Sequence, residues 1–471
     1  MLPEKVSAVS VAVLPGSERP GKEPIPPPEK RSRPYLYEVD RLRIVTALSV
    51  VAVHVLALMT FLDATVPALQ AQNAFVTLFH FTRAVFMFVT AFALVYVYDR
   101  KGFSWGEFWK RRGMGVVFPY AFWSFVYLLQ DPHPSTPLPF IQTFLLDLLT
   151  GQASYQLYYI LLTIQFYLLF PFFLKGLRRV AQHPWVVLGG SFALELGILY
   201  AIQSNWQAYL PVGIASLVTQ YEGSFVVIYQ FYFILGGLVA LNLSSVRAFL
   251  LRHGRLIVVS VGVTLAALEL NYFGALLIAH TSLDTAVSVL QPVMAFYSTA
   301  VIFCLYWLAY RQVSRIAQPA SARGQRIWHA LSDSAFGIYL VHPLLLTALI
   351  SLVSAYFMAW PPLLVIPLAW LITAAGSVAF SVLLLRIPIL SRLVGRSRPM
   401  PQLPALSVWW GNVSARFGWS EWLPVRGSKR WKKAAQSHGA LITEQAIDSL
   451  PHPLETGESR TVALVRKNAG S

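Results

Sequence analysis

The sequence has few charged residues and a single cysteine. Of its 471 residues, 12% are charged and 56% are hydrophobic, whereas soluble globular proteins carry about 25% charged residues. This shortage of charge excludes an ordinary soluble enzyme, a disordered regulator and a DNA-binding domain. Cys304 stands alone, which excludes an intramolecular disulfide and any zinc site built from several cysteines. No GxGxxG, Walker, HExxH or GxSxG pattern is present, so phosphate-loop, zinc-protease and esterase chemistry have no support, and we expect no metal.

The charge that is present is mostly positive. The 37 Lys and Arg residues outnumber the 21 Asp and Glu residues, which gives a net charge of +16. In a membrane protein such an excess is typical of cytoplasmic loops that lie near anionic lipid. We therefore expect a lipid bilayer as the partner and no nucleic acid, while the oligomeric state stays open.

Long apolar runs recur from Ile44 onward, and a helix needs about 20 residues to cross a bilayer. Ten runs approach or exceed this length: 44–61, 75–98, 115–129, 155–174, 185–203, 225–242, 256–278, 287–310, 334–357 and 362–386. The expected fold class is therefore all-α, a polytopic transmembrane bundle of about ten helices.

The loops between these runs alternate in charge. One set is basic and contains Lys101, Lys110, Arg111, Arg112, Lys175, Arg178, Arg179, Arg247, Arg252, Arg255, Arg311, Arg315, Arg323 and Arg326. The alternate set has no Lys or Arg and comprises 62–74, 130–154, 204–224, 279–286 and 358–361. Because basic loops stay in the cytoplasm, we expect both termini there and a multi-pass protein of the plasma membrane.

Three regions follow from this composition. Residues 1–35 form a basic, Pro-rich segment that cannot build a core, and we expect a disordered cytoplasmic tail. Residues 36–386 form the ten-helix membrane domain. Residues 387–471 interleave tryptophans with cations, which favours a cytoplasmic tail that lies partly on the membrane surface. Stacking on RNA uses the same residue types, but the preceding helices favour the membrane.

Ionisable side chains inside apolar spans are rare and mark functional sites. The first span carries Asp40 and Arg43 at its cytoplasmic mouth and His54 about 16 Å deeper, on the same helix face as Arg43. A neutral histidine can take a proton from a hydroxyl and return it. The alternative is a structural His54 that bonds a neighbouring carbonyl and joins helices.

The second span contains Arg83 at a depth similar to that of His54. A guanidinium at that depth must pair with an anion or line a wet cavity, where it could hold an acyl carbonyl, a phosphate or an oxyanion. The alternative is a buried ion pair with Glu195 or Glu269. His80, nearer the outer surface, is interpreted as structural.

A third informative stretch runs from Leu331 to Pro343. Its serines and Asp333 offer N-cap chemistry for a helix that begins at 332–334. His342 next to Pro343 is compatible with a kinked cavity wall or with a satisfied packing histidine.

Together these stretches resemble the acyltransferase-3 family of integral-membrane O-acyltransferases, over residues 36–386. Asp40, Arg43 and His54 match its first-helix signature, Asp-x-x-Arg followed by ten residues and a His. Arg83 and Phe88 match a second signature, in which Thr90-Ala91-Phe92 replaces Ser-Gly-Phe. Residues 331–343 are similar to the family's late Ser-Phe-Gly-Ile-Tyr-Leu-x-His-Pro signature, and at the 155–159 entry Gln156 stands where His is frequent.

The resemblance implies transfer of an acyl group from a cytoplasmic donor, usually acetyl-CoA, to a hydroxyl near the outer face. His54 and Arg83 would be the catalytic residues. Arg43 and Asp40 would bind the acyl-CoA donor. The acceptor would be a glycan or a lipid-linked molecule, and the acyl group would pass to it directly or through an acylated His54.

Two other readings stay open from the sequence. Ten spans with charge at mid-membrane depth also suit a transporter or exporter of a glycan or small solute, although no pair of Gly/Pro-broken helices is evident. A non-catalytic scaffold would instead work through its Trp-rich tail.

Overall fold

The structure is a computed structural model that describes residues 34–99, 103–130, 134, 136–315 and 322–396. Within these ranges its regular secondary structure is helical, with no strand, which confirms the all-α fold class. The predicted tail 1–35 lies almost wholly outside the described residues, as does the tail 387–471 beyond residue 396.

Nine segments of the described chain are long and apolar enough to cross a membrane. They are built from helices α1 (Tyr37–Leu58), α2 (Val66–Phe79), α3 (Thr82–Tyr98), α7 (Tyr158–Val180), α8 (Pro184–Gln203), α9 (Val212–Tyr221), α10 (Gln230–Leu241), α12 (Gly254–Leu277), α14 (Pro292–Arg315), α15 (Ala322–Tyr356) and α16 (Pro362–Arg386). The protein is therefore a multi-pass membrane protein.

The predicted span 115–129 is helical but divided. The chain forms α4 (Trp105–Arg112), a five-residue π-helical turn (Gly113–Val117) and the 11-residue α5 (Phe118–Leu128). Pro119 lies in the first turn of α5, where the missing N–H of a proline is harmless. The shorter helices α6 (Pro137–Thr150), α11 (Leu243–Arg252) and α13 (Leu283–Ala286) join the longer ones.

Two predicted spans are interrupted inside the bundle. Residues 75–98 divide between α2 and α3, which part at Phe79-His80-Phe81, and α10 is preceded by the 3₁₀ turns Glu222–Ser224 and Val226–Tyr229. Backbone that leaves the helical pattern at membrane depth is tolerated where protein covers it or where it lines a cavity. Hydropathy alone did not reveal either interruption.

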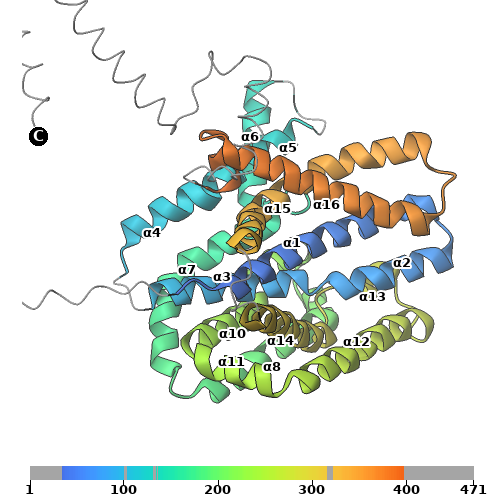
Figure 1. Ribbon diagram of the computed structural model, residues 1–471. Helices are drawn as coiled ribbons and strands as arrows, with labels where there is room; N and C mark the ends of the chain where they lie inside the picture. The colour runs from blue at the N-terminus through green and yellow to red at the C-terminus, as the bar shows by residue number, and fades with distance from the viewer. Residues whose placement is uncertain (1–33, 100–102, 131–133, 135, 316–321, 397–471) are drawn as a thin grey trace, which may run out of the picture. The chain divides into compact units, whose positions relative to one another are not determined.

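Helix α1 occupies the centre of the membrane domain. It contacts α2, α3, α14, α15 and α16, and Figure 1 shows it running between the α15–α16 pair and α14. Its buried side chains therefore face several partners at once, which places Asp40 and His54 inside the bundle.

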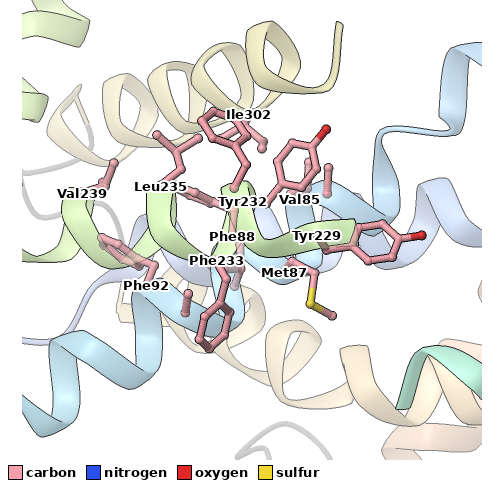
Figure 2. Packing of buried hydrophobic residues seen from close by; sticks show 14 of the residues in the cluster. Val85, Met87, Phe88, Phe92, Tyr229, Tyr232, Phe233, Leu235, Val239 and Ile302 are labelled. Carbon is pink, nitrogen blue, oxygen red and sulfur yellow. The ribbon is translucent and has the colours of Figure 1, made fainter. Parts of the chain in front are cut away.

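Helices α3 and α10 share the most extensive contact among the described helices. Figure 2 shows Phe88 and Phe92 of α3 against Leu235 and Val239 of α10, with Ile302 of α14 closing the cluster. Close packing of this kind holds membrane helices together, because lipid tails are as apolar as the side chains. Gly236 makes the approach possible, since a Cβ there would collide with the carbonyl oxygen of Phe88.

The chain returns to the bundle after α16. The short helix η6 (Leu390–Val394) packs against α5 and α16, and Trp123 donates its indole N–H to the Leu393 carbonyl at 2.9 Å. Ser391 and Val394 are buried. Residues 387–396 therefore belong to the packed domain.

We predict that Gly236→Ala destabilises the protein by about 1–3 kcal/mol, because the added methyl forces the backbones of α3 and α10 apart. Thermal unfolding in detergent measures the effect. Gly262→Ala on α12 is the matched control, since a Cβ there meets nothing within 4 Å. Equal melting temperatures for the two variants would contradict the close approach.

Candidate functional site

His54 lies between two other rings one turn before α1 ends. Its imidazole centroid is 4.5 Å from the ring of Tyr155 and 5.3 Å from the ring of His342. Tyr155 comes from the turn before α7, and His342 comes from α15. Three segments far apart in the sequence therefore meet at His54.

Arg83 lies in the first turn of α3, directly after the interruption at Phe79-His80-Phe81. Its guanidinium carbon is 5.1 Å from the ring centroid of Tyr158 at the start of α7. A desolvated cation above an aromatic face gains about 2 kcal/mol or more. The ring face thus stabilises Arg83 without neutralising its charge.

The ion pair considered for Arg83 is not formed within the described residues. Glu195 accepts a hydrogen bond from Gln230 at 3.3 Å, and Glu269 accepts one from Thr77 at 2.8 Å. No carboxylate of the described chain lies within ion-pair distance of Arg83. Its charge is therefore not neutralised by a carboxylate of the described chain.

His54 and Arg83 line the same cavity. Its volume is about 40 Å³, which holds a few water molecules. Polar and aromatic side chains surround it, and the remaining lining residues are Val50, Val53, His80, Thr82, Phe86, Gln156, Tyr158, Tyr159 and Tyr339. The structure thus brings together the two side chains that the sequence placed at similar depth.

A second, smaller cavity of about 20 Å³ is also lined by Arg83. It shares His80 and Arg83 with the first cavity and reaches Glu195 on α8 and Tyr229 before α10. The interruptions before α3 and before α10 both open onto it, which explains why the backbone tolerates them there. His80, interpreted as structural from the sequence, thus lines both cavities.

Two further residues of the first cavity carry no site assignment from the sequence. Gln156 is buried, its side-chain oxygen accepts from Ser154 at 2.6 Å, and its backbone carbonyl accepts from the Tyr339 hydroxyl. Tyr339 also packs edge-on against Phe86, with 6.2 Å between ring centroids. Its place three residues before His342 in the 331–343 stretch was the available signal.

The prediction that a helix begins at 332–334 was wrong, because α15 begins earlier in the sequence, at Ala322. Two of the residues interpreted as caps, Ser332 and Asp333, make side-chain contacts instead. Ser332 donates to Asp40 at 2.7 Å, and Asp333 pairs with Arg396 at 2.7 Å and with His329 at 3.1 Å. Helix α15 also continues through Pro343, and His342 is fully buried.

Asp40 joins α1 to its neighbours. One carboxylate oxygen accepts from the hydroxyls of Tyr35 at 2.9 Å and Ser332 at 2.7 Å. Burial and the Asp40 charge raise the pKa of Tyr35, which keeps that hydroxyl a donor. Arg43 is half-buried and lies one turn further along α1. Its positive charge interacts electrostatically with the carboxylate of Asp333. Asp40 thus has a structural task beside any contact with a ligand.

A second ionic contact holds the same end of α1. Glu38 is buried and pairs with Arg247 of α11. Partial burial of the guanidinium acts to lower the pKa of Arg247, but the hydrogen bond that Arg247 donates to Glu38 and the charge of Glu38 raise it overall. The described residues hold no group of three or more His, Cys, Asp or Glu side chains placed to bind a metal ion.

We predict that Asp40 and Ser332 are energetically coupled. In a cycle of Asp40→Ala, Ser332→Ala and the double variant, the coupling free energy should be about 1.5–3 kcal/mol, as for hydrogen bonds to charged groups. Chemical unfolding in detergent measures it. Additive effects of the two substitutions would contradict the contact.

The comparisons with known proteins agree with this architecture. A family model described as an acyltransferase domain, Acyl_transf_3, matches residues 36–386. Neither the curated proteins nor the solved structures contain a significant match. The match spans the helices that build both cavities, and it covers the same residues as the resemblance found from the sequence motifs. The chain is therefore a member of the acyltransferase-3 family and a membrane acyltransferase.

Proposed function

We propose that the protein is an O-acyltransferase that moves an acetyl group from acetyl-CoA to a hydroxyl of a glycan or lipid-linked acceptor. The observation that carries the proposal is that His54 and Arg83 line one cavity, with no carboxylate of the described chain paired to Arg83. A base and an unneutralised cation in one cavity are what acyl transfer to an alcohol requires.

The chemistry assigns one role to each group. His54 takes the proton of the acceptor hydroxyl, and the oxygen attacks the thioester carbonyl carbon. Arg83 stabilises the oxyanion that forms on the carbonyl oxygen. The carbon–sulfur bond then breaks, and the imidazolium of His54 returns the proton to the CoA sulfur. In the alternative route the acyl group rests on His54 before it reaches the acceptor.

The two substrates approach from opposite sides in this proposal. The basic loops mark the cytoplasmic side of the plasma membrane, and their charge attracts the anionic acyl-CoA. Arg43 lies at that end of α1 and would bind the phosphates or the pantetheine arm of the donor. Asp40 accepts a hydrogen bond from Ser332 and so joins α1 to α15 at the same end. His54 lies about 16 Å deeper by the helix rise, where the acyl group meets the acceptor from the outer side.

We predict that His54→Ala lowers acyl transfer by about 10²–10⁴-fold, because the proton acceptor is removed. The measurement is mass spectrometry of surface glycans and lipids from cells with the gene, without it, and with the variant. Intact protein should add the mass of one ester to its acceptor, and the variant should add none.

His183→Ala is the matched control, since His183 is exposed at the start of α8 and lines neither cavity. Full esterification by a well-inserted His54→Ala protein would refute the assignment. Solute flux without any ester product would indicate a transporter instead.

We predict that Arg83→Met lowers kcat by about 10²–10³-fold, the usual effect of removing an oxyanion donor. Arg83→Lys should restore only part of this loss, because lysine keeps the charge but lacks the planar fork. Arg311→Met is the control, as Arg311 lies 5.2 Å from the Trp307 ring centroid and lines neither cavity. An Arg83→Met protein with normal kcat and a raised KM would indicate a binding role only.

A further inference from the structure

His342 is held in one protonation pattern by its own helix. The side chain is fully buried, and its Nδ1 lies 3.2 Å from the backbone carbonyl oxygen of Ile338. Because a carbonyl only accepts, Nδ1 must carry the proton. In a neutral imidazole this leaves Nε2 as a hydrogen-bond acceptor.

That acceptor has no partner within the described residues. Leaving a buried polar atom unpaired costs about 1–3 kcal/mol, so such an atom calls for an explanation. Nε2 is at the tip of the ring, the part that extends furthest from α15. The site therefore offers an unused acceptor beside the predicted catalytic histidine.

The ring of His54 lies beside the ring of His342. The two imidazole planes are 22° apart and their centroids are separated by 5.3 Å. Two imidazoles joined by an N–H···N bond have centroids about 5 Å apart, which is the hydrogen-bond length plus two ring radii. The two rings are stacked in the structure, so forming the bond requires one of them to turn.

We propose that His342 is a positioning residue, whose Nε2 accepts a hydrogen bond from His54 and thereby fixes the tautomer of that ring. His54 then turns its other, unprotonated nitrogen toward the cavity that contains Arg83. This is the general arrangement of a base that a third group orients. The catalytic consequence rests on the proposed function, whereas the contact between the two rings does not.

The groups around His54 support this role. It is faced by His342 from α15, by His80 and Arg83 from the α2–α3 junction, and by Tyr155 from the turn before α7. None of these is a carboxylate, so a neutral ring takes the place that an acid holds in many catalytic triads. Protonation of His342 would convert its acceptor into a donor and release His54.

The test uses the full chain in detergent with ¹⁵N-labelled histidine. NMR of the wild-type protein should show His342 protonated on Nδ1 and a single tautomer for His54. In His342→Leu, His54 should become a mixture of tautomers. Spectra of His54→Gln and His342→Gln assign the signals.

Activity is measured with acetyl-CoA as donor and membranes of a strain lacking the gene as acceptor. His342→Leu should lower kcat by about 10–100-fold with little change in KM, as when a ligand-orienting partner is lost. His342→Gln should recover most of the rate, because its amide oxygen can accept from His54. The acidic limb of the pH–rate profile should change shape in His342→Leu but not in the glutamine variant.

His253→Leu is the matched control. His253 makes the same contact to the carbonyl four residues earlier, 3.0 Å from the Phe249 oxygen, and it lines neither cavity. The substitution should leave the His54 tautomer and the pH profile unchanged.

An unchanged His54 tautomer in His342→Leu would overturn the proposal, whatever happens to the rate. If His342→Leu does not fold, the wild-type spectrum decides, and a His342 Nε2 that accepts no hydrogen bond from His54 overturns it. A tautomer change in His342→Leu together with full activity of His54→Ala would support the ring contact and refute the proposed function alone.

Discussion

The guanidinium of Arg83 imposes the main constraint on this membrane domain. An uncompensated cation inside an apolar bundle is expensive, and the described chain meets it with the face of Tyr158 and two small cavities instead of a carboxylate. The interruption before α3 lies directly before Arg83, and His80 of that interruption lines both cavities with it. Glu195 and Glu269, the available acids, bond to Gln230 and Thr77.

Around that cation the bundle builds a site from distant segments. His54 comes from α1, Gln156 and Tyr158 come from the entry to α7, and Tyr339 comes from α15. Helix α1 can serve all of them because it lies at the centre and contacts five other long helices. The tight packing of α3 on α10 at Gly236 holds in place the helix that carries Arg83.

Much of this could be predicted from the sequence, for physical reasons. Apolar length identified the nine candidate spans of the described chain, whereas the tenth expected run, 115–129, is not among them. The rarity of charge in those spans singled out His54 and Arg83. The interruption at His80 and the early start of α15 could not be predicted, because tertiary contacts determine both. Ser332 has the composition of a cap, yet its hydroxyl bonds to Asp40 on another helix. Asp40 was predicted to bind the donor, a role that stays a prediction, and its hydrogen bonds to Tyr35 and Ser332 became visible only with both helices in place.

The short helix η6 has a practical consequence for anyone who cuts or recombines this chain. The family match ends at residue 386, but the indole of Trp123 and the buried Val394 show that the chain still packs against α5 beyond that point. Arg396, whose guanidinium pairs with Asp333 on α15, fastens the same stretch to the bundle. A chimera or truncation joined at 386 would strip a covering piece from α5 and α15, so the natural junction for such work lies after residue 396.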